Sequence, residues 1–325
     1  IFSYEISVSD DDVYYYQPYA VNTYGETKSE DFREFSLSFT NLSERGTSNS
    51  YIVSNAGRYT FNGGVIGNGS FGIIDTANFH TSNVEIYPTS AELLWESKEG
   101  MITDVNFIHE NSEIRFVTDG TEGNAVIAAK DANGTILWSW HIWITDKPEE
   151  HNYINYNKQS FRVLDRNLGA TRADRGAENE WEESRGLAYQ WGRKDPFEWY
   201  KCESVDRTLT IQESIENPTL VPENHYTWTP EQNYELWNDQ LKTIYDPCPV
   251  GYRVAVQGVW SGFSKTGKSV NYLEDMNVWG EYYHGHNFIY DGTNTAWYPE
   301  GTSFNGYYPE SGILWSSTKL GNAQL

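Results

Sequence analysis

The chain has 325 residues, enough for two or three domains of ordinary size, and a formal charge of −23 at pH 7. Such an acidic field argues against nucleic acid and against direct adsorption on anionic lipid, because both partners would repel it. No run approaches the about 20 apolar residues that a membrane-spanning helix needs. The 13 Trp and 24 Tyr supply large side chains for cores and contact surfaces.

The cysteines and the first residues of the sequence give information about the cellular compartment of the protein. Cys202 and Cys248 are the only two cysteines of the sequence. One pair in a thiol-poor chain fits a structural disulfide formed in an oxidising compartment, but two unpaired buried thiols fit equally well. The chain opens on Ile1 with neither an initiator methionine nor a basic leader, which we interpret as a processed or trimmed chain rather than a cytoplasmic protein.

Residues 1–40 are predicted to contain short strands. Residues 13–21 are rich in tyrosine and β-branched side chains, 22–25 carry a turn signal, and 32–39 alternate as a further strand. Three strands make a poor domain alone, so either they pair with strands later in the chain or an upstream part is missing. The run Tyr-Ala-Val-Asn-Thr-Tyr-Gly at 19–25 resembles the end of a fibronectin type III domain, which implies that an earlier part of such a domain precedes the chain.

Residues 41–146 are predicted to form a β-sandwich domain. The segment 41–49 is polar and reads as a linker. Strand-like runs separated by turn signals come after it, at 50–54, 58–61, 91–95, 102–108, 113–117, 124–129 and 135–144.

The last of these runs has two distinct faces. Trp138, Trp140 and Ile142 alternate with Ser139, His141 and Trp143. A tryptophan stripe could be a carbohydrate-stacking platform, but we favour a strand buried on both sides because the run is central and apolar.

Residues 147–325 are predicted to form an irregular α+β domain. Residues 161–170 are strand-like, and 171–185 are charged. The region after them is rich in Trp and Tyr and shows little regular spacing of apolar residues. The best helix candidate is 230–241, with Thr229 as its cap and Pro230 at its first position. The expected fold class is therefore mainly β, with β-sandwich modules followed by an irregular α+β domain.

Four motifs of this last domain occur together in one family. They are Leu-Asp-Arg-Asn-Leu-Gly-Ala at 164–170, Gly-Leu-Ala-Tyr-Gln-Trp-Gly-Arg-Lys-Asp-Pro-Phe at 186–197, Asp-Pro-Cys-Pro-Val-Gly-Tyr-Arg-Val at 246–254 and Ile-Leu-Trp-Ser-Ser-Thr at 313–318. In this order they resemble the Fibrobacter succinogenes major paralogous domain, over about residues 155–325. The strand pair at 124–143 looks like the pair that precedes this domain in such proteins.

The resemblance implies a C-type-lectin-like fold, similar to that of formylglycine-generating enzymes. It also implies a surface lipoprotein or fimbrillin-like protein of a Bacteroidetes-type bacterium. Two departures stand out. Family members read Gly-Trp-Arg-Leu-Pro-Thr where this chain has Gly-Tyr-Arg-Val-Ala-Val at 251–256. The family pattern also continues with further strands where this chain ends at Leu325, so we expect the C-terminal end of the domain to be missing.

The most conspicuous motif residues are expected to be structural. Asp165 and Arg166, within reach of Arg172 and Asp174, are expected to form a buried or semi-buried ion-pair network. Gly169 permits a tight turn.

Candidates for chemistry are few, and no catalytic residue is assigned. The chain has no Gly-x-Ser-x-Gly, His-Glu-x-x-His or phosphate-loop motif. His284 and His286 would place two imidazoles on one strand face, which keeps a divalent metal as an alternative to no cofactor, although no third ligand is evident. Three aspartates at 10–12 could attract Ca²⁺, but a charged turn is the alternative.

The aromatic stretch at 279–308 holds the candidates for ligand contact, because Tyr and Trp among Gly, Asn and Asp make adaptable binding surfaces. The residues assigned to this surface are Trp279, Tyr282, Tyr283, Tyr290, Trp297, Tyr298 and Tyr307. An irregular domain that uses the same aromatics as its core is equally consistent with the sequence.

We therefore expect an exported, non-enzymatic cell-surface adhesin or fimbria-associated subunit, located at the outer-membrane surface or in a fimbria. Its expected partners are an extracellular glycan or protein, fimbrial subunits included. Nucleic acid is not an expected partner. Contact with the membrane is expected only through a lipid anchor outside this sequence. A structural pilus component with an exchangeable terminal strand, and a glycan-active enzyme with two facing carboxylates, are the alternatives.

Overall fold

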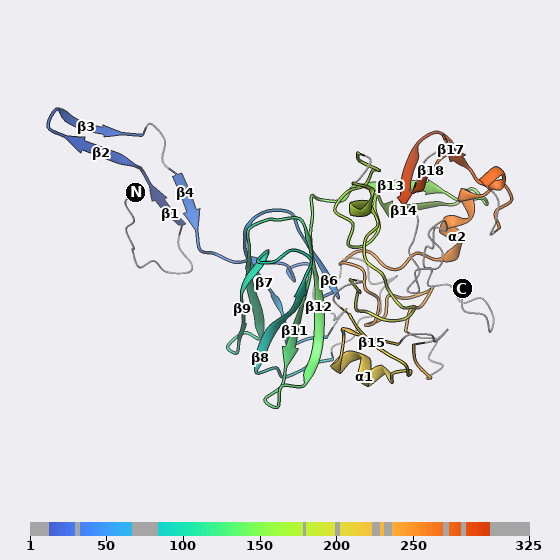
Figure 1. The fold of residues 1–325 in the computed structure, drawn as a ribbon, viewed down its shortest axis with the longest axis horizontal. Coiled ribbons are helices and arrows are strands. Elements are labelled where there is room, and N and C mark those ends of the chain that lie inside the picture. Colours follow the sequence, from blue (N-terminus) through green and yellow to red (C-terminus); the bar gives the residue numbers. More distant parts are fainter. Residues whose placement is uncertain are drawn as a thin grey trace.

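The computed structural model describes residues 13–29, 33–66, 84–177, 180–198, 202–222, 228–230, 236–268, 273–280 and 284–299. This described part is mainly β, with its strands distributed over several sheets, as predicted. Figure 1 shows three parts in chain order: an extended N-terminal ribbon, a two-sheet sandwich, and a C-terminal part built from short elements.

The N-terminal ribbon consists of β1 Val13–Tyr16, β2 Tyr19–Asn22, β3 Gly25–Lys28 and β4 Arg33–Ser36. Antiparallel pairing joins β1 to β4 and β2 to β3. The strand predicted over 13–21 is interrupted at Gln17 and Pro18, since proline has no N–H to offer a ladder. The Gln17 side chain donates to the carbonyl of Ser29 at 2.7 Å and bridges the interruption.

The sandwich confirms the strands predicted between residues 50 and 144. One sheet has the order β5–β7–β10–β9, with β5 Thr40–Asn41, β7 Gly57–Asn62, β10 Glu113–Thr118 and β9 Ile102–Ile108. The other has the order β6–β12–β11–β8, with β6 Ser50–Val53, β12 Ile136–Ile144, β11 Gly123–Lys130 and β8 Ser90–Glu96.

Alternating apolar side chains fill the space between the two sheets. On β10, Ile114 and Phe116 are fully buried while the residues between them are not. Phe61 of the first sheet meets Trp140 of the second edge to face, with ring centroids 5.3 Å apart. Each such fully buried side chain stabilises the fold by about 1.5–3 kcal/mol.

Strand β12 is buried on both faces, which confirms the arrangement favoured from its sequence. Trp138 and Trp140 belong to the sandwich core. On the opposite face Ser139, His141 and Trp143 are also buried, because the C-terminal part covers this side of the sheet. A carbohydrate platform on this strand is therefore excluded.

The segment predicted as a linker at 41–49 is instead partly interior. Residues 46–50 are buried, and Asn49 is 1% exposed. The Asn49 amide donates to the carbonyls of Ile244 and Asp246 at 2.7 and 2.9 Å, and its oxygen accepts from the Trp138 indole at 2.9 Å. Polar composition suggested a linker, but these side chains satisfy buried backbone groups of a distant segment.

The C-terminal part contains short elements in three small sheets. The strands are β13 Glu150–Ile154, β14 Ser160–Leu164, β15 Glu203–Val205, β16 Leu220–Pro222, β17 Val278–Trp279, β18 Gly285–Ile289 and β19 Thr295–Pro299. The helices are η1 Trp181–Ser184, α1 Ile211–Glu216, α2 Gln257–Trp260, η2 Ser261–Phe263 and η3 Leu273–Asp275. Two separate apolar clusters replace one large core.

The helix predicted over 230–241 is wrong in its described part, since 236–241 contains no helix. The Asn238 side chain accepts from the backbone N–H groups of Gln240 and Leu241. Such local bonds compete with helical ones. Residues 231–235 lie outside the described residues. The helix α1 escaped prediction, although Thr210 and Glu213 form a capping box there.

A buried polar junction attaches the C-terminal part to the sandwich. The Lys194 ammonium donates to the hydroxyl of Ser139 at 2.6 Å and to the carboxylate of Asp195 at 2.7 Å, and it lies 4.4 Å from the Trp138 ring centroid. The Lys194 and Asp195 side chains are only 2% and 4% exposed. Burial lowers the pKa of Lys194, and Asp195 opposes that shift.

Candidate functional site

The register of the β17–β18–β19 sheet sorts its side chains onto two faces. Val278, Phe288 and Ala296 are cross-strand neighbours on one face, and of these Phe288 and Ala296 belong to the apolar cluster around Tyr153 and Phe263. Trp279, Asn287 and Trp297 are neighbours on the other face. The second face is the candidate site, because its outer tryptophan reaches solvent.

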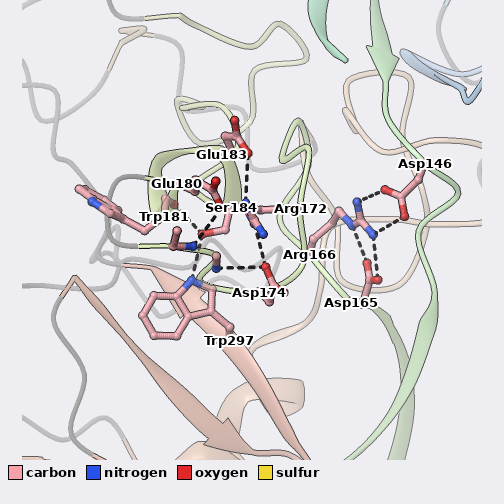
Figure 2. Close-up of polar contacts among 12 residues, drawn as sticks. Asp146, Asp165, Arg166, Arg172, Asp174, Glu180, Trp181, Glu183, Ser184 and Trp297 are labelled. Carbon is pink, nitrogen blue, oxygen red and sulfur yellow. Dashed lines mark hydrogen bonds and ion pairs between the residues drawn. The ribbon is translucent and has the colours of Figure 1, made fainter. Parts of the chain in front are cut away.

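Exposure on this second face differs between its two tryptophans. Trp297 is 5% exposed, and its indole N–H donates to the Ser184 hydroxyl of η1 at 2.9 Å (Figure 2). Trp279 lies on the edge strand β17 and is 62% exposed. The buried Trp297 thus anchors η1 on the sheet, while Trp279 presents a large aromatic surface beside the amide of Asn287.

A surface ion-pair network holds the loop that carries η1. Figure 2 shows the Arg172 guanidinium bonded to Asp174 and Glu180, both at 2.7 Å, and to Glu183 at 3.3 Å. The Ala177 backbone N–H also donates to Glu180 at 2.9 Å, and together with Arg172 it lowers the pKa of that carboxyl. Several bonds to one guanidinium restrict the loop more than a single exposed ion pair would.

A second network lies where the loop leaves the sandwich. The Arg166 guanidinium donates to the carboxylates of Asp165 and Asp146 (Figure 2). The side chains of Arg166 and Asp165 are 4% and 6% exposed, which confirms the predicted buried ion pair. Arg172 and Asp174 do not take part in this network, so the structure has two separate networks where one was predicted.

Trp181 in η1 makes the closest aromatic contact of the site. Its ring stacks on the imidazole of His284, with centroids 4.3 Å apart and planes 7° from parallel. The guanidinium of Arg185 also lies over the Trp181 ring, 4.6 Å from its centroid. Trp181 is not among the predicted site residues, although a single tryptophan within the charged run at 171–185 was a usable signal.

The two imidazoles predicted to lie on one strand face do not share one. His284 precedes β18, and its φ of 67° takes the backbone out of the strand conformation. His286 lies inside β18 and meets Phe288 edge to face at 6.3 Å. Among the residues that the structure describes, no group of three or more His, Cys, Asp or Glu side chains could hold a metal ion.

Most of the predicted ligand-contacting aromatics are interior or lie outside the described residues. Tyr298 is buried, with its hydroxyl 2.7 Å from that of Tyr153, so it and Trp297 are core side chains, not ligand contacts. Tyr290 is partly buried and stacks on Tyr153 at 4.9 Å. The residues outside the described part are Tyr282, Tyr283 and Tyr307, together with the aspartates at 10–12. Among the predicted ligand-contacting residues that the structure describes, Trp279 alone has an exposed ring.

The two cysteines are unpaired, which corresponds to the second alternative left open by the sequence. The Cys202 thiol donates to the carbonyl of Glu198 at 3.0 Å. The Cys248 thiol is buried, and this burial, with Asp246 nearby, raises its pKa well above the usual range. Neither thiol is a reactive thiolate, because both pKa values are raised.

A buried chain of Ser50, His141 and Asn124 has the order of a nucleophile, base and orienting group. The Asn124 amide nitrogen donates to the Gly169 carbonyl at 2.9 Å, so its oxygen accepts from His141 Nε2, and His141 Nδ1 then accepts from the Ser50 hydroxyl. The side chains are 1%, 1% and 7% exposed for Ser50, His141 and Asn124 respectively. A cleft of about 280 Å³ borders Ser50, Ile52 and Val250, but the Ser50 hydroxyl is not open to a substrate. The three hydrogen-bonded side chains therefore have a structural role.

Comparisons of the sequence and structure with protein-family models, curated proteins and solved structures find no match. Within the described ranges, no helix is both long enough and apolar enough to cross a lipid bilayer. The family resemblance therefore stays a prediction, and the function is argued from the site itself.

Proposed function

We propose that this protein is an extracellular binding protein of the bacterial surface, an adhesin or a fimbria-associated subunit. In this proposal it contacts a glycan or protein ligand through Trp279. The observation that carries the proposal is the 62% exposure of Trp279 on a face whose other tryptophan is tied to η1. Tryptophan is enriched among the residues that contribute most of the binding energy at contact surfaces.

The surroundings of Trp279 fit a rigid platform with polar groups beside it. Asn287 is its cross-strand neighbour and offers both a donor and an acceptor to a ligand. The anchored Trp297 fixes the sheet from the same side. An indole face beside an amide suits the apolar face and the hydroxyl rim of a pyranose ring, and it equally suits an aromatic or proline side chain of a protein.

The formal charge of −23 favours uncharged or cationic ligands over anionic ones. Two described guanidinium groups next to η1 are already engaged, Arg172 with three carboxylates and Arg185 with Glu182 and Trp181. A sulfated or sialylated glycan would therefore find neither of these two groups uncommitted.

Trp279→Ala is expected to weaken binding of the ligand at least tenfold, because a tryptophan at the centre of a contact contributes about 2 kcal/mol or more. The ligand would first be identified on a neutral and charged glycan array and on an array of surface proteins. Affinities would then be measured by calorimetry for both forms of the protein.

Tyr87→Ala is the matched control, because Tyr87 is 79% exposed and lies on the sandwich. The control should bind as the unaltered protein does. Equal affinity of the Trp279→Ala variant and the unaltered protein for every identified ligand would refute the proposed site. Tighter binding of sulfated or sialylated glycans than of their neutral counterparts would refute the preference for uncharged partners.

A further inference from the structure

The N-terminal ribbon is the most exposed part of the described chain. All residues of β2 and β3 are exposed, so neither face of this hairpin is covered. Five large side chains of the ribbon are also exposed, with fractions of 46–98%: Tyr15, Tyr16, Tyr19, Val21 and Tyr24. A two-stranded ribbon in water is marginally stable, and more strands are needed for independent stability.

The edge of β3 that faces away from β2 has backbone N–H and C=O groups available for hydrogen bonding to a further strand. Asn22 and Gly25 flank the two-residue turn and exchange hydrogen bonds, and Ala20 and Thr27 do the same one repeat further along. The backbone N–H and C=O groups of Glu26 and Lys28 therefore point away from β2. In the described residues β3 has no second neighbouring strand, so this edge is open.

The charges on this edge are complementary to a second copy of themselves. Glu26 and Lys28 lie on one face of β3, and their charged groups are 2.9 Å apart. If two β3 edges pair antiparallel about a two-fold axis at Thr27, Glu26 of each copy lies opposite Lys28 of the other. A slip of two residues would instead oppose like charges, which is destabilising.

The position of the ribbon reduces the main obstacle to self-association. Two copies of a chain with a charge of −23 repel each other, but within residues 13–29 the only charged side chains are Glu26 and Lys28, which cancel; acidic residues lie just outside this segment, at 10–12 and 30–31. Figure 1 shows the ribbon projecting from the sandwich, away from the C-terminal part. Ten residues from Val13 to Asn22 span about 30 Å. That exceeds the screening length of about 8 Å at physiological salt.

We propose that the open edge of β3 is a self-association surface, and that its partner is a second copy of this chain. Pairing about Thr27 joins two hairpins into a four-stranded sheet with two reciprocal Glu26–Lys28 contacts. In that sheet Tyr19 and Val21, the cross-strand partners of Lys28 and Glu26, lie on the same face as the charged pair. A dimer of this kind would present two ligand-binding faces.

The test is sedimentation equilibrium of the full chain over a concentration series. The apparent mass is expected to rise from 37.3 kDa toward twice that value. Glu26→Lys and Lys28→Glu, each alone, oppose like charges at both contacts, so each is expected to weaken dimerisation at least tenfold. An equimolar mixture of the two variants restores unlike pairs and should recover the dimer.

Lys98→Glu is the control for Lys28→Glu, since it makes the same charge change at an exposed position on the sandwich. It should dimerise as the unaltered chain does. A chain that stays at 37.3 kDa throughout, or a mixture of the two variants that does not associate, overturns the proposal. Dimerisation that is indifferent to Glu26→Lys and Lys28→Glu places the interface elsewhere and overturns it as well.

Discussion

Asp195→Ala is expected to lower the free energy of unfolding by about 3–5 kcal/mol, because it leaves a buried ammonium without its counter-ion. Lys194 is 2% exposed in its side chain, and its partners after the change would be the hydroxyl and carbonyl of Ser139. These dipoles cannot balance a full charge at such depth. Denaturant unfolding followed by tryptophan fluorescence measures the effect.

Two comparisons distinguish this loss from a general effect of removing a carboxylate. Asp174→Ala removes an exposed ion pair with Arg172 and should cost at most about 1 kcal/mol. The double change Lys194→Met with Asp195→Leu removes both charges and should cost less than Asp195→Ala alone. If Asp195→Ala is no more destabilising than Asp174→Ala, the junction does not depend on this pair.

Acidification is expected to destabilise the protein through His141, between pH 6.5 and about pH 3. Burial lowers the pKa of His141 from 6.5 to about 3. In that window the unfolded chain binds a proton that the folded chain does not, so stability falls as the pH falls. The full effect is on the order of 5 kcal/mol, and about 3 kcal/mol of it is lost by pH 4. Above pH 6.5 this contribution no longer varies.

His141→Gln tests the assignment, because glutamine cannot titrate and can still donate to Asn124 and accept from Ser50. The variant will be less stable at pH 7, but its free energy of unfolding should fall less steeply toward pH 4. The carboxylates are common to both proteins and cancel in the difference. His109→Gln, at an exposed position, should leave the pH dependence in place. Parallel curves for His141→Gln and the unaltered protein would contradict a buried neutral imidazole.

The sandwich strands were predictable because their signal is local. A strand buried on one face alternates side chains with a period of two, and β10 does so with Ile114 and Phe116. The continuous apolar run of β12 also predicted its burial on both faces. The buried Asp165–Arg166 pair was predictable because a buried carboxylate and a buried guanidinium each require an opposite charge nearby.

The candidate site was less predictable, because an aromatic side chain serves equally as core or as contact surface. Trp279 and Trp297 have the same chemistry and lie on the same face, yet one is 62% and the other 5% exposed. The difference comes from η1, about one hundred residues earlier in the chain, which covers only one of them. No local pattern encodes such a contact.

Local patterns were enough to predict that this is a mainly β protein, where its sandwich strands lie, and that β12 is buried. Those properties derive from the spacing of apolar side chains along a strand. Packing between distant segments decides three further features: the polar segment before Ser50 is interior, the cysteines stay apart, and Trp279 lies in solvent while Trp297 does not. Each of these features depends on a contact between segments that are distant in the chain, such as the hydrogen bond between Asn49 and Ile244. Tertiary packing brings such segments together, and neither segment encodes the contact alone.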